Sequence, residues 1–388
     1  MPTTKVAKQL NEQTVLVLQG GGALGSYQAG AYEALATAKH KPNWIAGISI
    51  GAVNAAIIAG NRPEDRIARL HQFWSKVSSN LQGPQALLGT DGRTAYNETS
   101  AFLATMTGIP GFFTPKLPIV YAAPWLSQFI PPWLLPVSPT DALSYYDTSP
   151  LRATLLELVD FDLLNSKIMR LSIGAVHIKS GKLVYFDTDE QVIGPEHIMA
   201  SGALPPGFPP VMIDGEAYWD GGIVSNTPLQ YVLDAAPKSD DLCIFQVDLF
   251  SARGEMPQTM ADVAEREKEI RYASRTRDNT NKATDILLMQ QAAKRLMEKL
   301  PHDLKLDEDA QFLVSNVPDR IVTIVQLIHR PTSYDTQSKD VEFSRLSMDE
   351  HWSAGKKDVE RTVAHPRWTA RKRPNDSVTV LDLAHPKA

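Results

Sequence analysis

The stretch Trp44-Ile45-Ala46-Gly47-Ile48-Ser49-Ile50-Gly51 determines how the rest of the chain is organised. The apolar run 44–46 suits a strand, and the small apolar residues 52–59 suit a buried helix. Between them lies G-x-S-x-G, the sharp strand-to-helix turn that lifts a serine hydroxyl clear of a sheet edge. A nucleophile's backbone is strained in this turn, and a Cβ at Gly47 or Gly51 would collide with the neighbouring strand or helix. We therefore predict that Ser49 is a nucleophile rather than part of a structural turn.

A glycine-rich stretch lies upstream, Gly20-Gly21-Gly22-Ala23-Leu24-Gly25, directly after the apolar run 15–18. Its spacing fits the dinucleotide pattern G-x-G-x-x-G, which also requires a carboxylate ending a second strand about 20 residues on. Residues 38–43 contain no carboxylate, and the next strand runs into the serine turn. We therefore interpret the loop as an oxyanion hole built from backbone N–H groups around Gly21 and Gly22. Nucleotide-dependent redox chemistry is the alternative, and NAD(P) binding would reveal it.

A third motif, Asp220-Gly221-Gly222, follows a dense run of turn residues at 200–210. An Asp-Gly-Gly sequence alone is most often only a turn. Its alternative role is to hold Asp220 beside Ser49 as a general base, which a desolvated carboxylate can be when it bonds directly to the hydroxyl.

Composition narrows the class of protein. The chain has 388 residues, 43% of them hydrophobic, as in an ordinary globular protein, and its net charge of −5 gives no indication of nucleic acid binding. The single cysteine, Cys243, lies in an apolar run, so no disulfide framework is possible. Without C-x-x-C or H-E-x-x-H spacings we expect no metal and no cofactor. Residues 1–13 are polar and show no signal peptide, so we expect a cytoplasmic location, with peripheral contact at the inner face of the membrane as an option.

Residues 109–137 differ from the rest of the chain. They contain seven prolines, and Lys116 carries the only charge. The prolines exclude a continuous membrane-spanning helix. Two interpretations stay open: an apolar loop folded back on the core, or a lid or acyl-binding mouth that dips into a lipid interface. The candidate acyl or lipid contacts are Phe112, Phe113, Trp125, Phe129 and Trp133.

The three motifs, in this order and with this gap between the first two, resemble those of the patatin-like phospholipases. The resemblance covers about residues 13–250, and the charged helical part after it is similar to the extension of one bacterial subgroup. It implies a three-layer α/β/α fold with a mostly parallel central sheet. We expect a catalytic domain over 13–256 and a mainly helical C-terminal extension over 257–388, packed on that core.

The resemblance also implies a chemistry, namely calcium-independent hydrolysis of lipid acyl esters by a Ser49–Asp220 dyad. It assigns the oxyanion hole to Gly20, Gly21, Gly22, Ala23 and Gly25, the serine turn to Gly47 and Gly51, and the acid turn to Gly221 and Gly222. The family often has Arg or Lys at the position of Leu24, so this chain lacks that charge.

Two other functions remain open at this point. One is a catalytically weak or inactive lipid- or protein-binding module on the same scaffold. The other is a Ser-His-Asp hydrolase, for which the available late histidines are His329, His351 and His365. The sequence indicates neither the lipid class nor the oligomeric state.

Overall fold

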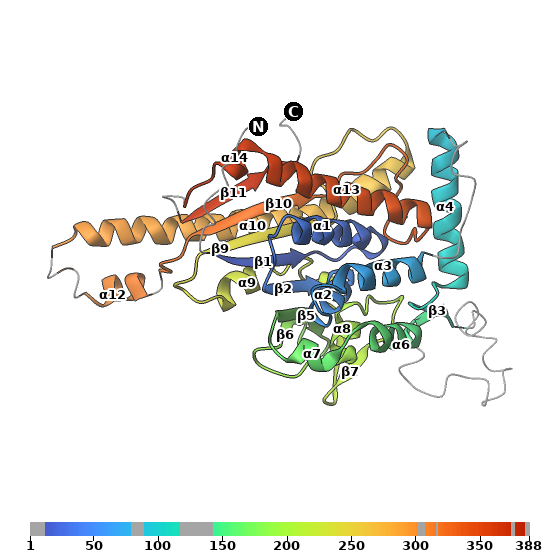
Figure 1. The fold of residues 1–388 in the computed structure, drawn as a ribbon, viewed down its shortest axis with the longest axis horizontal. Helices are drawn as coiled ribbons and strands as arrows, with labels where there is room; N and C mark the ends of the chain where they lie inside the picture. Colours follow the sequence, from blue (N-terminus) through green and yellow to red (C-terminus); the bar gives the residue numbers. More distant parts are fainter. Residues whose placement is uncertain are drawn as a thin grey trace.

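A nine-stranded sheet forms the centre of the molecule (Figure 1). The computed structural model describes residues 12–78, 89–116, 143–301, 304, 307–315, 317–373 and 377–384. The strands follow the order β11-β10-β9-β1-β2-β5-β8-β7, and β6 pairs with β5. All pairs from β11 to β5 are parallel, and the pairs made by β6, β7 and β8 are antiparallel. The strands are β1 Gln13–Leu18, β2 Trp44–Ile48, β5 Arg170–His177, β6 Lys182–Asp187, β7 Val211–Ile213, β8 Glu216–Asp220, β9 Leu242–Asp248, β10 Val322–Ile328 and β11 Val378–Asp382.

Helices connect most of these strands. The longer ones on the N-terminal side are α1 Ser26–Thr37, α2 Ile50–Ala59, α3 Arg66–Val77, α4 Thr90–Thr107 and α6 Ser149–Leu158. Shorter ones are η1 Gly22–Gly25, α7 Phe161–Asn165, α8 Pro195–Ser201, η5 Gly221–Ile223 and α9 Leu229–Ala235. The C-terminal third adds α10 Met260–Lys299, α12 Glu308–Ser315, α13 Arg345–Ala364 and α14 Pro366–Thr369. A separate two-stranded sheet pairs β3 Thr114–Pro115 with β4 Tyr146–Asp147.

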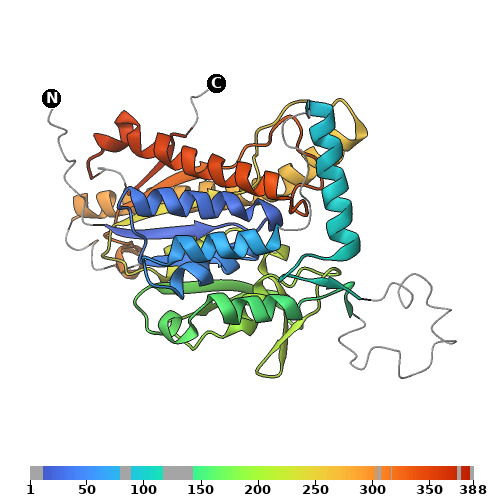
Figure 2. The ribbon, with the colours of Figure 1, turned by 45° about the vertical axis from the view of Figure 1, so that its right-hand side comes forward.

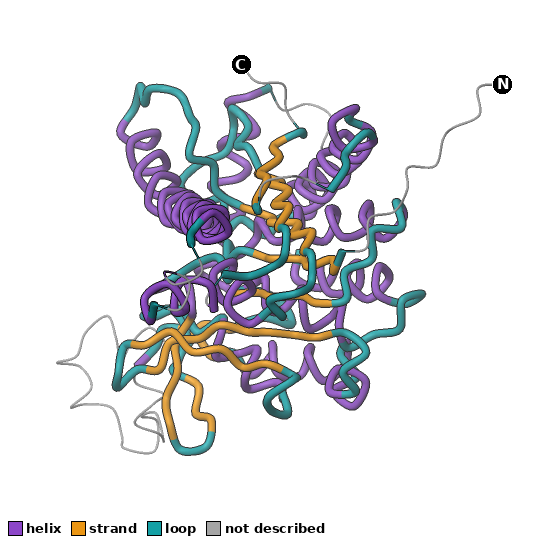
Figure 3. Tube along the Cα trace, turned by 90° about the vertical axis from the view of Figure 1, so that its left-hand side faces the viewer, coloured by secondary structure: helices purple, strands orange, loops and turns teal. Residues whose placement is uncertain are grey.

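Successive side chains of each strand point to opposite faces of the sheet, so each face has its own apolar core. Val15 and Val17 of β1 face a core shared with α9 and α10, whereas Leu16 and Leu18 face the larger core shared with α1, α2, α3 and α13. Figure 3 shows the strands between these two groups of helices. Both faces of a parallel sheet need such covers, because the strands are apolar on both sides. The predicted three-layer α/β/α fold is therefore confirmed.

Strand β5 brings the ends of two other strands together. One edge of β5 pairs with β6 over residues 172–177. Both β2 and β8 pair with residues of β5 inside that same span, so they must lie along its other edge. There β2 ends with Ile48 opposite Gly174, and β8 ends with Asp220 opposite Ala175, the next residue. The carboxyl ends of β2 and β8 therefore meet head to head, which places Ser49 next to Asp220.

The C-terminal third continues the same sheet. Strand β10 pairs with β9, and β11 pairs with β10. On the outer face α13 lies along α1, as the red and blue helices of Figure 2 show. A Cβ on Gly30 of α1 would be 1.9 Å from the carbonyl oxygen of Trp352, and one on Gly355 of α13 would be 2.0 Å from that of Tyr27. Glycine at both positions lets the two backbones touch.

None of the helices in the described part of the chain is long and apolar enough to cross a membrane.

Candidate active site

Ser49 occupies the turn between β2 and α2 with a strained backbone. Its φ of 58° and ψ of −126° lie where non-glycine residues are rare. Added to Gly47, a Cβ would be 2.4 Å from the Gly51 carbonyl oxygen, and added to Gly51, 2.5 Å from the Leu18 carbonyl oxygen. Both predicted collisions are confirmed, and they explain why this turn contains glycine at positions 47 and 51.

Ser201, at the end of α8, is hydrogen-bonded to this turn. Its hydroxyl oxygen accepts a hydrogen bond from the Ser49 backbone N–H at 2.9 Å and donates one to the Gly174 carbonyl oxygen at 2.7 Å. Ser201 is fully buried. One hydroxyl therefore links the serine turn to β5.

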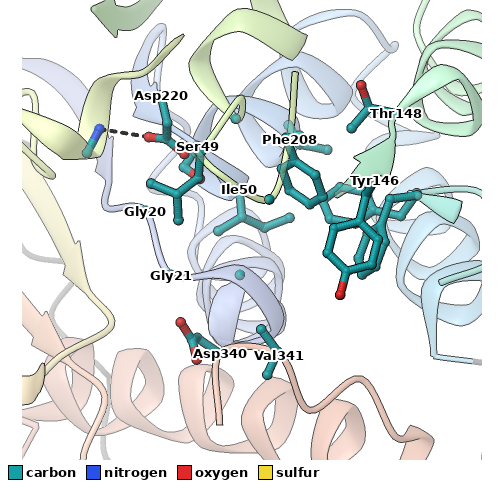
Figure 4. Close-up of a pocket in the computed structure, with 18 of the residues that line it drawn as sticks. Gly20, Gly21, Ser49, Ile50, Tyr146, Thr148, Phe208, Asp220, Asp340 and Val341 are labelled. Atoms are coloured by element: carbon teal, nitrogen blue, oxygen red, sulfur yellow. Dashed lines mark hydrogen bonds between the residues drawn. The ribbon is translucent and has the colours of Figure 1, made fainter. Parts of the chain in front are cut away.

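Asp220 lies at the end of β8, directly beside Ser49 (Figure 4). Its carboxylate is buried, accepts a hydrogen bond from the Gly222 N–H at 2.7 Å and lies beside the Ser49 side chain. Burial raises the pKa of Asp220 to about 7, although the neighbouring Gly222 N–H and Ser49 hydroxyl act in the opposite direction. A carboxyl group with this pKa can accept and return a proton near neutral pH, which an exposed aspartate does poorly.

The glycine loop, residues 20–25, lies next to Ser49 at the carboxyl end of β1. The Gly20 N–H donates to the Asn226 carbonyl oxygen at 3.2 Å, and the Ala23 N–H donates to the Asp340 carbonyl oxygen at 2.8 Å. Among the described residues, no acceptor is bonded to the N–H of Gly21 or Gly22, and both residues line the cavity that contains Ser49. Of the predicted oxyanion residues, Gly21 and Gly22 are thus the ones with donors available to a substrate.

The remaining members of the glycine loop have structural contacts. Ser49 Cβ would lie 2.9 Å from a Cβ on Gly20, and Ile50 and Trp74 crowd Gly25 within 3.0 Å. The Leu24 side chain is fully buried in the larger core. An apolar side chain that points away from solvent therefore occupies this position of the loop.

A cavity of about 320 Å³ opens above Ser49. Its wall includes Ser49, Asp220, the Gly20–Gly22 backbone and a mostly apolar remainder. Aromatic side chains dominate one side, where Phe208 packs at 5.2 Å from Phe113 and 6.1 Å from Phe112 between ring centroids. Other apolar lining residues are Ile50, Val53, Tyr146, Leu151, Met199, Leu204 and Phe343. The cavity can therefore hold a hydrocarbon chain next to the Ser49 hydroxyl.

The structure places only part of the predicted lipid contacts. Phe112 and Phe113 line the cavity beside β3. Trp125, Phe129 and Trp133 lie outside the described residues.

No histidine is among the described residues that line this cavity. His329 and His351 are buried against each other, with ring centroids 4.9 Å apart, and burial lowers the pKa of both. His365 caps α14. The arrangement around Ser49 therefore contains an aspartate but no imidazole, which argues against a Ser-His-Asp triad.

Sequence reasoning did not assign three further residues of the site. Ser201 supports the serine turn, and Asp340 contacts the glycine loop from more than 300 residues away in the chain. Asn226 is bonded to both backbone groups of Gly20: its carbonyl oxygen accepts the Gly20 N–H, and its side-chain amide donates to the Gly20 carbonyl oxygen at 2.9 Å. Only Asn226 had a local signal, namely an amide four residues after Gly222 in a turn-rich stretch.

Comparisons with known proteins bear on the family of this chain. The model of the family described as patatin-like phospholipase matches residues 16–233, and a second model, described as patatin phospholipase, matches residues 270–375. No curated protein sequence matches the chain.

Solved structures give weaker likenesses. VipD from Legionella pneumophila is 15% identical, with 96% of this chain and 72% of that chain covered and a TM-score of 0.33. The type III effector protein ExoU is 12% identical, with 89% and 54% covered and a TM-score of 0.27. The structure of ExoU in complex with SpcU from Pseudomonas aeruginosa is 14% identical, with 95% of this chain and 82% of that chain covered and a TM-score of 0.28. At these TM-scores the likenesses add nothing to the assignment, which depends on the family model.

That model spans more than half of the chain, and it includes the glycine loop, the serine turn and the Asp-Gly-Gly turn. The chain belongs to the patatin-like phospholipase family.

Proposed function

We propose that this protein is a lipid acyl hydrolase that uses Ser49 as nucleophile and Asp220 as general base. The observation that carries the proposal is a strained serine beside a buried carboxylate at one end of an apolar cavity. Membership of a family of lipid ester hydrolases points to the same reaction.

The reaction follows from the positions of these groups. Ser49 Oγ attacks the ester carbonyl carbon while Asp220 takes the hydroxyl proton, and the Gly21 and Gly22 N–H groups stabilise the oxyanion. The C–O bond to the alcohol then breaks as Asp220 gives its proton to the leaving oxygen. Water next attacks the acyl-enzyme, Asp220 takes its proton, and that proton returns to Ser49 Oγ as the fatty acid leaves.

The apolar cavity supports a hydrocarbon acyl group in the substrate. Burying each methylene contributes about 0.8 kcal/mol, so an acyl chain lying among Phe112, Phe208 and Phe343 binds through its length. We propose that the head group lies toward the opening.

We propose that the reaction needs no calcium ion. Asp220 supplies the base, and backbone N–H groups supply the oxyanion stabilisation, so neither step requires a cation. An excess of EDTA is expected to leave the rate of ester hydrolysis unchanged, and loss of activity that calcium restores would contradict this.

The decisive experiment combines fluorophosphonate labelling with ester hydrolysis. We expect one adduct on Ser49 in the wild type, no adduct in Ser49→Ala, and a strongly reduced labelling rate in Asp220→Asn. Each variant should keep the wild-type circular dichroism spectrum, which shows that the loss is chemical. A folded wild type without Ser49-dependent labelling or turnover, also in detergent micelles, would favour a non-catalytic binding module.

We also propose peripheral contact with a lipid surface near the cavity. Phe102 and Met106 on α4 are 62% and 56% exposed, and Tyr145 beside β4 is 52% exposed. Large exposed apolar side chains of this kind commonly mark an interaction surface. Wild type should sediment with phospholipid vesicles more than Phe102→Ser/Met106→Ser does, and equal sedimentation would contradict the proposal. The cytoplasmic location stays a prediction from the sequence.

A further inference from the structure

The 337–343 loop, which connects β10 to α13, lies against the glycine loop. The carbonyl oxygen of Asp340 accepts the Ala23 N–H at 2.8 Å. Gly22 has φ +55°, and a Cβ there would be 2.1 Å from that same oxygen. Asp340 and Val341 also line the Ser49 cavity, opposite Gly21 in Figure 4. The backbone at Asp340 therefore contacts the segment that presents the Gly21 and Gly22 N–H groups.

Two lysines hold this loop on α10. Lys268 Nζ lies 2.5 Å from Asp340 Oδ1 and donates to the Gln337 carbonyl oxygen at 3.0 Å. Lys339 is buried, and its Nζ lies 2.6 Å from Glu269 and 3.0 Å from Glu265. One ion pair thus joins the loop to a lysine of α10, and two more join Lys339 of the loop to carboxylates of α10.

Helix α10 is in turn fixed to the sheet near the site. Arg266 lies 3.4 Å from Glu269 and donates to the carbonyl oxygens of Ser251 and Ala252, in the segment after β9. Polar contacts therefore run from the end of β9 through α10 and the 337–343 loop to the glycine loop.

We infer that Lys268 and Lys339 are positioning residues for the oxyanion hole, and this inference depends on the proposed function. Ion pairs that only attached a surface loop would have no effect on the chemical step. These ion pairs hold the carbonyl group that fixes Ala23, and the two available N–H groups lie on the preceding residues, Gly21 and Gly22. Oxyanion donors act only when they are held in place before the reaction, so a looser Asp340 backbone lowers the rate of the chemical step.

If the inference is right, substitutions at these ion pairs lower kcat and change KM little. In Lys268→Met, hydrolysis of p-nitrophenyl butyrate is expected to lose about 10- to 100-fold in kcat, less than the 10²–10³ typical for removing a whole oxyanion donor. KM should change by less than about twofold, because Lys268 itself does not line the cavity. Lys268→Arg should recover most of the kcat, since it keeps the charge beside Asp340. Asp340→Asn, which removes the other partner, should resemble Lys268→Met.

Lys356→Met is the matched control. Its Nζ lies 2.7 Å from Glu33 on the α1–α13 face, and the residue does not line the Ser49 cavity. It should keep the wild-type kcat. Lys339→Met tests the buried ion pairs, and its circular dichroism shows whether it folds; if it does not fold, the part-exposed Lys268–Asp340 pair carries the test.

The outcomes are distinguishable. Wild-type kcat in folded Lys268→Met and Asp340→Asn, an equal loss in Lys356→Met, or a change in KM alone would overturn the inference and leave the proposed function standing. A wild type with no turnover above Ser49→Ala would overturn the proposed function, and this inference with it.

Discussion

At the scale of single residues, the site depends on a buried carboxyl group, that of Asp220. Asp220 must be ionised to take the Ser49 proton, and burial raises its pKa to about 7. Below that pH the protonated fraction grows. We therefore expect kcat/KM to fall about tenfold per pH unit below 7 and to level off above it. The measurement is the pH profile of a soluble ester between pH 5 and 9.

Asp248 offers a matched control for this profile. Burial raises its pKa to about 7 as well, but it bonds to Gln246 and is not among the residues that line the Ser49 cavity. Asp248→Asn should keep the same acidic limb. A limb that disappears in this variant would assign the titration to Asp248 and contradict the role of Asp220.

Ser201 gives a second prediction at this scale. Ser201→Ala leaves the Ser49 N–H and the Gly174 carbonyl oxygen without their buried partner. We expect a loss of about 1–3 kcal/mol in the free energy of unfolding, measured in urea, together with a lower kcat.

Ser166→Ala is its control, because the Ser166 hydroxyl donates to the Leu163 carbonyl oxygen at 2.6 Å, at an exposed helix end. Its effect on stability should stay within about 0.5 kcal/mol. An equally small effect for Ser201→Ala would show that Ser201 does not support the serine turn.

At the scale of elements, the contact between α1 and α13 allows no side chain at its closest points. In Gly30→Ala the new Cβ would meet the Trp352 carbonyl oxygen at 1.9 Å, so one helix must move away from the other. Overpacking of this kind typically costs about 1–3 kcal/mol, which exceeds the gain in helix propensity from alanine. The free energy of unfolding of Gly30→Ala should fall accordingly.

Gly89→Ala provides the comparison, since none of the described residues lies within 4 Å of a Cβ at that position and its φ is −60°. Its stability should change by less than that of Gly30→Ala. If the two variants are equally stable, α1 and α13 pack less closely than the structure shows.

The elements also show what the sequence could predict. The serine turn and the glycine loop each follow a strand and precede a helix within about ten residues, so their local pattern was sufficient. Asp340 lies more than 300 residues from Ala23 and Ser201 about 150 from Ser49, and no local pattern reports such contacts. The edge strand β11 has only five residues, too few for a clear alternation.

At the scale of the whole molecule, the predicted boundary at 256/257 falls between β9 and α10, and the sheet continues past it. Seven residue pairs align β10 with β9, and α10 covers the same apolar face as α9. Cooperative units usually follow such shared cores rather than positions along the sequence.

We therefore expect β10 to unfold together with β1 and β2. In native-state hydrogen exchange, the amides of Ile324 and Val325 should show the same free energy of opening as those of Leu16 and Ile45, because all four are buried in one sheet. The exposed Thr99 and Met106 of α4 should exchange much faster and serve as the internal reference. If the β10 amides instead open at a clearly lower free energy than those of β1 and β2, residues 257–388 behave as a separate unit. The 337–343 loop, which follows β10, would then be released from the glycine loop whenever that unit opens, and activity would be lost at denaturant concentrations below those that unfold β1 and β2.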